Sequence, residues 1–436
     1  MKRNLPQPVD SAFIKKANKV TVLQAIRESD SISRPTIAHK TGLSLPTVTR
    51  IVKSLINEDG LVVNTGVENA RRGRPPDRLK FNGENNYVIG VDLGYTHIYG
   101  VLSNLNAKII SELRIPTQIR SDKMVVLKRV AEVVKYLIRQ ADVNRSRIFG
   151  VGVAVGGLID KERNILKRND DFNWDDVEIS RILESWADLP VHFDNVTRVM
   201  ALGELWYGIG RQYKNFICVN AGHGIGAGFI IDGRPFYGSI GMAGQIGCMM
   251  ADPRSTLRCA CGNYGCLAAI ASGYGIAQAA RQRLDAGDES SLRAQCEGDM
   301  GRITAEMVAH AANEGDQVAR DVFFQAALNI GVSIASLIDI FGPQAVVIGG
   351  GLTLAGEMLF QPIRDAVNQR SLKQMAANVQ ILPATFGMKS AVMGALALIL
   401  NDLLHLDIPI PGKRQSQEFP ADTEAAKEPA DISLAM

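Results

Sequence analysis

The sequence lacks any long run of apolar residues, and it lacks a hydrophobic segment at its start. A membrane-spanning helix needs about 18 consecutive apolar residues, so the chain is not expected to span a bilayer. The first ten residues, MKRNLPQPVD, have no apolar core of the kind that a signal peptide requires. We therefore expect a cytoplasmic protein.

The sequence is also poor in cysteine and in excess charge. Its 48 basic and 45 acidic residues leave a net charge of only +3, which by itself indicates no class of partner. The six cysteines are expected to be reduced thiols or metal ligands, because disulfides are rare in the cytoplasm. With 436 residues, of which 46% are hydrophobic, the chain can bury more than one core, so we expect two or three domains.

The charge is unevenly distributed along the chain. Residues 1–85 contain 15 of the basic and 8 of the acidic residues, a net charge of +7. The remaining 33 basic and 37 acidic residues give the rest of the chain a net charge of −4. A basic head on a slightly acidic body suits a nucleic-acid-binding module that is joined to a part with another task.

Residues 31–61 predict two helices joined by a tight turn. Ser33 suits the N-cap of the first helix, Gly42 allows the left-handed conformation of the corner, and Ser44 suits the second N-cap. Apolar residues at three- and four-residue steps give the second helix one buried face: Val48, Ile51, Val52, Leu55 and Ile56. Its short polar and basic residues are typical of a DNA recognition helix, and we predict DNA contacts by Ser44, Pro46, Thr47, Thr49, Arg50 and Lys53.

A basic hairpin is expected directly after this pair of helices. Short strands are predicted at 61–63 and 78–81, and between them Arg71, Arg72 and Arg74 form a tip suited to the minor groove or the phosphate edge. With a first helix at about 18–27, preceded by a loose arm, this predicts a winged helix-turn-helix DNA-binding domain over residues 1–82. An αα-hairpin inside a larger helical domain is the alternative.

From residue 83 onward, strands that end in glycine turns alternate with helices, which is typical of an α/β fold. The first unit is expected to have strands at 87–94, 98–104, 108–115 and 148–157 and a helix at 121–140. The second is expected to have helices at 198–208 and 318–341, a strand at 216–220, a glycine-rich turn at 221–228 that leads into a strand at 229–231, and a glycine cluster at 349–351. Two such units indicate duplicated lobes around a cleft. We predict a small lobe over 83–197 that is joined by a C-terminal helix at 390–405, a large lobe over 198–389 and a disordered tail over 406–436.

Four cysteines have the spacing of a metal site. Cys259, Cys261 and Cys266 lie within eight residues, Cys248 lies eleven positions upstream, and the intervening glycines let the backbone fold around an ion. Four thiolates match a closed structural zinc site, which organises a loop and does no chemistry itself. Ordinary buried thiols are the alternative.

Taken together, the winged helix, the Asp-x-Gly turn at 92–94, the GxGxG turn and the Cys-x-Cys-Gly-x-x-Gly-Cys segment resemble the ROK family of bacterial repressors and sugar kinases. The resemblance covers about residues 13–404. It implies a two-lobed fold like that of actin or hexokinase, with a sugar site in the cleft and, in the kinases, an ATP site beside it. The repressor branch adds an N-terminal winged helix.

The chain departs from the kinase pattern at three positions. Val196 stands where the kinases have the aspartate that takes a proton from the sugar, and an apolar side chain cannot act as a general base. Tyr95 replaces a glycine of the phosphate site, and His223 replaces a threonine of the second glycine turn. The resemblance therefore implies a protein that is not an enzyme.

The sugar site is altered as well. Asn169 and Asn195 match sugar ligands of the family, and Gln245 takes the place of a glutamate; these three are the predicted effector contacts. Ala268 replaces a second glutamate, and Cys248 replaces a histidine, which makes the implied zinc site all-cysteine. Because two strong acceptors are lost, the ligand is altered, weakly bound or absent. As alternatives, Asn169 caps a turn, Gln245 supports the cysteine loop and His223 is a structural loop residue.

These features predict a transcriptional regulator, a repressor of carbohydrate-related genes. We expect a homodimer or a dimer of dimers that binds a palindromic operator in double-stranded DNA and responds to a sugar or sugar derivative in the cleft. One alternative is an ATP-dependent sugar kinase with a regulatory DNA-binding head. The other is a repressor that is controlled by a partner protein and not by a sugar.

Overall fold

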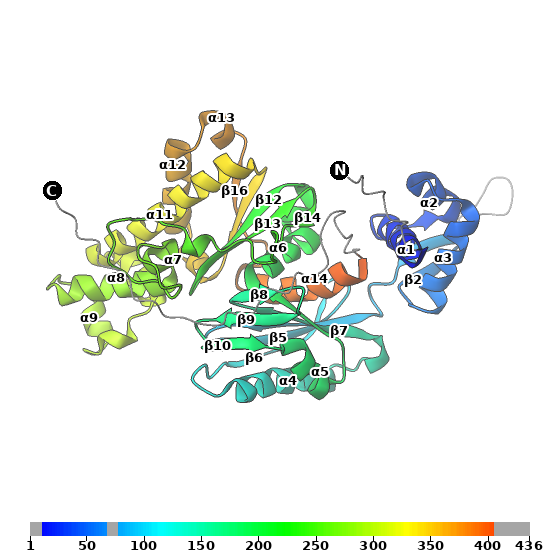
Figure 1. Cartoon of the computed structure of the whole chain (residues 1–436), viewed down its shortest axis with the longest axis horizontal. Coiled ribbons are helices and arrows are strands. Elements are labelled where there is room, and N and C mark those ends of the chain that lie inside the picture. Colours follow the sequence, from blue (N-terminus) through cyan, green and yellow to red (C-terminus); the bar gives the residue numbers. More distant parts are fainter. Residues whose placement is uncertain (1–10, 68–76, 405–436) are drawn as a thin grey trace, which may run out of the picture.

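The structure is a computed structural model, and it describes residues 11–67 and 77–404. Figure 1 shows a small head at one end of the molecule beside a larger body. The predicted α/β class and the predicted order of a helix-turn-helix head followed by a two-lobed body are confirmed.

Local signals in the sequence form the head as predicted. The Ser33 hydroxyl accepts a hydrogen bond from the Thr36 amide, and the Ser44 hydroxyl accepts one from the Thr47 amide. Gly42 ends the first of these two helices with φ +70°, the left-handed conformation that glycine adopts without strain. The head's elements are α1 (Ser11–Arg27), β1 (Ile32–Ser33), α2 (Arg34–Thr41), α3 (Leu45–Asn57), β2 (Val62–Val67) and β3 (Asp77–Phe81).

Two details of the head differ from the prediction. α1 begins at Ser11 and not at about residue 18, because residues 11–27 contain no glycine or proline to interrupt a helix. The two-residue strand β1, which pairs with β3, was not predicted, since two residues are too short for any hydrophobic pattern. The arginine tip at 71–74 lies outside the described residues.

The body contains two five-stranded sheets with the same topology. In sequence order within each unit, both run 3-2-1-4-5: β6-β5-β4-β7-β11 in the first and β14-β13-β12-β15-β16 in the second. The first three strands of each unit are antiparallel, and the last two run parallel to the first. The duplication that the glycine turns indicated is therefore present.

The first unit holds β4 (Tyr87–Leu93), β5 (His97–Asn104), β6 (Ile109–Pro116), α4 (Lys123–Gln140), β7 (Ile148–Val155), β8 (Leu158–Asp160), β9 (Ile165–Asn169), β10 (Trp174–Val177), α5 (Ile179–Ala187) and β11 (Val191–Asn195). The second holds α6 (Val196–Tyr207), β12 (Phe216–Ala221), β13 (Ile225–Ile231), β14 (Arg234–Pro235), α7 (Leu267–Ala271), α8 (Gly273–Asp285), α9 (Leu292–Gln295), α10 (Ala305–Asn313), α11 (Gln317–Phe341), β15 (Ala345–Gly349), α12 (Glu357–Arg370), α13 (Lys373–Ala376) and β16 (Gln380–Pro383). α14 (Ser390–Leu404) completes the described chain.

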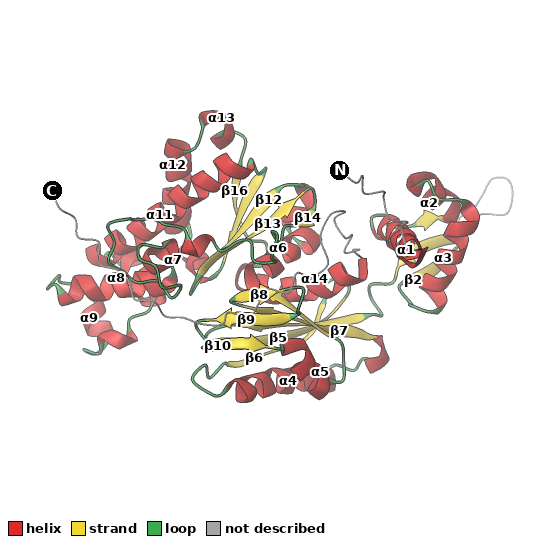
Figure 2. Ribbon diagram, viewed as in Figure 1, coloured by secondary structure: helices red, strands yellow, loops and turns green. Residues whose placement is uncertain are grey.

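Two helices, α6 and α14, lie between the sheets, as Figures 1 and 2 show. α14 packs on β4 and β7, α6 packs on β12 and β13, and the two helices pack on each other. Side chains that alternate along β12 face opposite ways: Phe216 and Cys218 face α6, whereas Ile217 and Val219 join the core around α11. Helices α4 and α5 cover the outer face of the first sheet.

One further prediction about the body was wrong in detail. The turn predicted at 221–228 is shorter, because β13 already begins at Ile225. Gly228 lies inside β13, where a side chain would meet the Thr197 carbonyl oxygen at 2.4 Å, so its role is to let α6 approach the strand. Val196 is the first residue of α6.

One described helix, α11, is long and apolar enough to cross a membrane by length and composition alone. It packs against α7, α8, α10 and α12, and its buried side chains belong to the core of the second unit. These are the contacts of a core helix. The predicted disordered tail lies outside the described residues.

Candidate functional site

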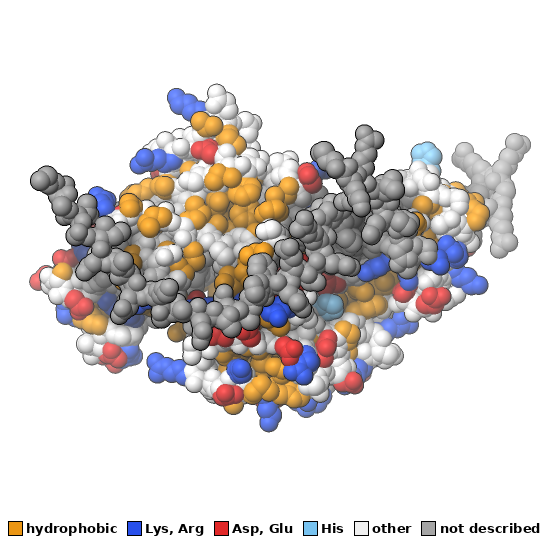
Figure 3. All heavy atoms as spheres, in the orientation of Figure 1, with side chains coloured by type: hydrophobic (Ala, Val, Ile, Leu, Met, Phe, Trp, Pro, Cys, Tyr) orange, Lys and Arg blue, Asp and Glu red, His pale blue; other side chains and the backbone are white. Residues whose placement is uncertain are grey.

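The recognition helix α3 presents its polar face to solvent. Val48, Val52 and Leu55 are fully buried in the head, which fixes the orientation of the helix. The predicted DNA contacts lie away from this core: Ser44, Pro46, Thr49, Arg50 and Lys53 are exposed, and Thr47 is half-buried. Among the described residues, neither Arg50 nor Lys53 has an ion-pair partner. Figure 3 shows basic side chains along the outer surface of the head.

The cleft between the lobes contains a cavity of about 300 Å³, and all three predicted effector residues line it. Asn169 comes from β9, Asn195 from the end of β11, and Gln245 from the loop before the cysteines. Val196 lines the same cavity. A second cavity of about 560 Å³ adjoins it on the side of the cysteine loop and shares Asn169 and Gln245 with it. The volumes are those of a small-molecule site.

The side chains of both asparagines form hydrogen bonds with backbone groups. The Asn169 amide donates to the Gly156 carbonyl (2.9 Å), and its oxygen accepts from the Phe172 amide (3.1 Å), so the residue does cap a turn. The Asn195 amide donates to the Gly157 carbonyl (2.8 Å), and its oxygen accepts from the Thr197 amide (2.9 Å). Among the described residues, no hydrogen bond involves the Gln245 side chain.

Asp194 is sequestered beneath the cleft. It is fully buried, and it pairs with the buried guanidinium of Arg198 (2.9 Å from Nε to Oδ1) and with Lys161 (3.4 Å). Burial alone would raise the pKa of Asp194, but these two cations outweigh it and hold the pKa below its ordinary value. A carboxylate that is buried and paired with two cations in this way is a weak base. Sequence reasoning missed this pair, although its i,i+4 spacing was visible.

Two aromatic rings line the cleft between the glycine turns. Tyr95, in the turn after β4, stacks on His223, in the turn after β12, with ring centroids 3.9 Å apart and planes 15° apart. His223 Nε2 lies 3.6 Å from a carboxylate oxygen of Asp171. The stack joins the two glycine turns, so His223 is more than an isolated loop residue. No sequence signal links two rings so far apart along the chain.

Asp92, at the floor of the cleft, is an acid with a raised pKa. Burial raises the pKa to about 7, and Arg114 offsets only part of this effect. The neutral, protonated form of this carboxyl group is therefore more accessible than that of an exposed aspartate.

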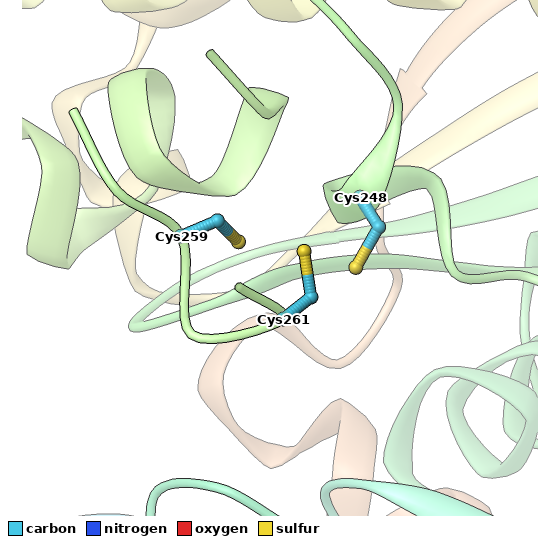
Figure 4. A group of neighbouring side chains, drawn as sticks. All are labelled: Cys248, Cys259 and Cys261. Carbon is cyan, nitrogen blue, oxygen red and sulfur yellow. The ribbon is translucent and has the colours of Figure 1, made fainter. Parts of the chain in front are cut away.

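Three of the four predicted metal ligands come together, and the fourth lies beside them. The sulfurs of Cys248, Cys259 and Cys261 lie within 4.8 Å of one another and point toward one another in Figure 4. Cys266, the N-cap residue of α7, has its sulfur 3.7 Å from that of Cys261. Four thiolates around a tetrahedral zinc ion stand about 3.8 Å apart. The cluster can therefore hold a metal ion.

The backbone of the loop is folded to bring these sulfurs together. Gly262 and Gly265 have φ of +95° and +67°, as a tight reversal needs. Burial and the neighbouring thiols raise the pKa of Cys248 and of Cys266 to about 12 each. At neutral pH these thiols lose their protons only when a cation compensates the negative charge.

A DNA-binding head with an exposed recognition helix, joined to a two-lobed body with a small-molecule cleft, defines a ligand-controlled transcriptional regulator. The sequence pattern of the ROK family matches residues 88–402, and that of winged helix-turn-helix DNA-binding proteins matches residues 17–59. The chain belongs to the ROK family.

The chain is similar both to transcriptional regulators and to sugar kinases, and the two groups of relatives differ in how much of the chain they match. The xylose repressor of Caldicellulosiruptor bescii is 31% identical over 90% of this chain and 97% of its own length. The crystal structure of a ROK family transcriptional regulator, a homologue of the E. coli MLC protein, matches with a TM-score of 0.77 at 29% identity, over 90% of this chain and 97% of that chain. A ROK family glucokinase from Streptomyces griseus, in complex with glucose and AMPPNP, matches with a TM-score of 0.65 at 28% identity, over 72% of this chain and 99% of that chain. The repressors therefore cover the head as well as the body.

Proposed function

We propose that the protein represses carbohydrate-related genes and releases its operator when a sugar or sugar derivative occupies the cleft. The observation that supports this most directly is the combination of an exposed recognition face on α3 with a cleft lined by Asn169, Asn195 and Gln245 in one chain. A homodimer or a dimer of dimers in the cytoplasm would place two recognition helices in successive major grooves of a palindrome. The sugar acts by binding one relative position of the lobes more tightly than another.

Arg50 and Thr47 are the proposed base contacts, and Lys53 is a proposed phosphate contact. Arg50→Ala should cost about 1–3 kcal/mol of operator affinity and relax the preference at one base pair of each half-site. Lys53→Ala should instead weaken binding to all sequences equally and make the slope of log K against log salt concentration less steep by about one. Competition binding against a series of single-base operator variants separates the two roles. Equal loss on every variant would contradict base reading by Arg50.

The three polar residues of the cleft are the proposed effector contacts. Because a ligand stabilises the state that it binds, a sugar at about 100 times its Kd should raise the melting temperature by roughly 5–10 °C. Gln245→Glu should enlarge this shift at a fixed sugar concentration, since a carboxylate is a stronger acceptor for sugar hydroxyls, whereas Asn169→Ala should reduce it. A thermal-shift panel of pentoses, hexoses and amino sugars makes the comparison. If no sugar shifts any of the three proteins, control by a partner protein replaces control by a sugar.

We infer that the cleft does not catalyse phosphoryl transfer. The general-base position holds Val196, the nearby Asp194 is paired with two cations, and the Tyr95–His223 stack fills the space beside the glycine turns. Incubation with ATP and the same sugars should give no turnover, and Val196→Asp should not restore it, because the stack remains. Turnover by the wild type at the roughly 1–100 s⁻¹ of ordinary kinases would establish the alternative, a kinase with a regulatory head.

We also propose that the ion held by the four cysteines is zinc and that its role is structural. All four ligands come from the protein, and all are thiolates, which leaves no open position for substrate or water. The ion would hold the loop that carries Gln245 against the cleft and would do no chemistry itself.

A further inference from the structure

Helix α6 runs from the cleft to the head. Its N-cap residue, Asn195, lines the cavity, as do Val196, Thr197 and Met200 in its first turns. Its last turn holds Trp206, which is 5% exposed and belongs to the buried cluster that also contains residues of the head. Twelve helical residues span about 18 Å, so a single rigid element covers the distance between ligand and head.

At the far end, α6 is held by the last residue of α1. The Arg27 guanidinium carbon lies 4.0 Å from the centre of a Trp206 ring, and Arg27 Nη2 donates to the Trp206 carbonyl at 3.4 Å. That carbonyl belongs to the last turn of α6, where the helix dipole favours a cation. Arg27 therefore caps a helix of the body with a side chain from the DNA-binding head, a contact between residues 179 positions apart.

The interface between the head and the body around this contact is apolar and continuous. One buried cluster contains Leu23 and Leu55 of the head, Trp206 of α6 and Leu396 of α14. α14 itself contacts α1. A side chain at Gly394 would meet the Val199 carbonyl oxygen at 2.0 Å, so α6 and α14 pack backbone to backbone where they cross. Because two helices packed this closely leave little free space, α6 and α14 are expected to move together and not to deform separately.

At the cleft end, the helix is directly accessible to a ligand. A sugar hydroxyl that bonds to Asn195 competes with the bonds that this side chain makes to Gly157 and to the first turn of α6. Thr197 fixes the same turn to β13 of the second sheet by donating to the Ala227 carbonyl at 3.0 Å. Ligand binding therefore acts on the end of α6 and on its attachment to one lobe.

We propose that α6 transmits occupancy of the cleft to the DNA-binding head, and that the Arg27–Trp206 contact is the coupling point. This inference rests on the proposed function and names the route by which it is regulated. The competing route is the chain connection itself, where the Asn82 and Asn86 side chains bond to the Gly60 carbonyl. Substitution of Arg27 distinguishes the two routes.

The test uses the full-length chain and an operator selected from a pool of random duplexes, with D-xylose and D-glucose as probes. Arg27→Met keeps an unbranched apolar side chain of about the length of the aliphatic part of arginine and removes the guanidinium. It should bind operator within about threefold of the wild type, whereas sugar-induced release should fall from about tenfold or more to less than about threefold. Arg27→Lys, which retains a cation, should recover part of the response. The matched control is Arg34→Met, which breaks an ion pair to Asp77 inside the head and should leave the response intact. A full sugar response in Arg27→Met would overturn the inference.

A second arm needs no sugar. Asn195→Ala in the cleft should change operator affinity by about fivefold or more in the wild-type background and by less than about twofold in the Arg27→Met background. If Asn195→Ala does not fold, Val196→Thr, which keeps the N-cap intact, replaces it in this double-mutant cycle with Arg27→Met. Equal effects in both backgrounds would refute transmission through α6. Failure of the wild type to bind any duplex would instead refute the proposed function.

Discussion

Replacing Arg71, Arg72 and Arg74 together by alanine is expected to weaken operator binding by about two to three orders of magnitude at ~0.1 M salt. Each arginine that neutralises a phosphate releases counterions, so the slope of log K against log salt concentration should become less steep by about 0.9 per residue. The loss should be similar for operator and for unrelated DNA, because contacts to the backbone carry no sequence information. Fluorescence anisotropy titrations over a range of salt concentrations measure both quantities.

A matched triple substitution separates local contact from overall charge. Lys128, Lys135 and Arg139 are exposed on α4, on the outer face of the first sheet. Changing all three to alanine removes the same net charge away from the predicted DNA surface, and it should leave the salt slope almost unchanged. Equal effects of the two triple substitutions would contradict a wing that contacts DNA, and an unchanged slope in the Arg71, Arg72 and Arg74 variant would do the same.

Removal of the metal should have the second large effect. The purified protein should contain one zinc ion per chain by elemental analysis, and Cys261→Ser should lose it. Without the ion, the thiols of Cys248 and Cys266, whose pKa values are raised, revert to the protonated form, and the loop loses its main organising element. We expect the melting temperature to fall by at least about 5 °C and the sugar response to weaken, because the loop carries Gln245.

Cys296→Ala is the control for this experiment. Cys296 is fully buried and lies apart from the cluster, so the substitution should cost some packing energy but leave one zinc ion bound. Full retention of zinc by Cys261→Ser would show that this sulfur is not a ligand. A metal-free wild type with an unchanged melting temperature would contradict a structural zinc site.

Features with a local physical cause were predictable from the sequence. The caps at Ser33 and Ser44 and the turn at Gly42 were predicted residue by residue, since capping depends only on neighbours within a few positions. The convergence of Cys248 with the Cys259–Cys266 segment was predicted from spacing and glycine content, because the loop that joins them is short. The alternating strands and glycine turns indicated two equivalent lobes, which the shared strand order bears out.

Features that depend on distant segments were not predictable. The stack of Tyr95 on His223 and the cap that Arg27 provides to α6 each join residues more than a hundred positions apart. The residues in these two contacts are of ordinary types for their positions, so neither periodicity nor composition reveals either contact. The error at Gly226 and Gly228 has the same origin: these residues were read as turn glycines, whereas they let α6 pack closely on β13.

Control of the head's affinity for DNA by the cleft is tested most directly by the affinity of the intact chain for its selected operator, titrated at several salt concentrations with and without the sugar that gives the largest thermal shift. Tight, salt-sensitive binding that the sugar weakens about tenfold or more is expected. Absence of salt-sensitive affinity for any duplex, or operator binding that no sugar alters while ATP-dependent turnover of that sugar is observed, would contradict it.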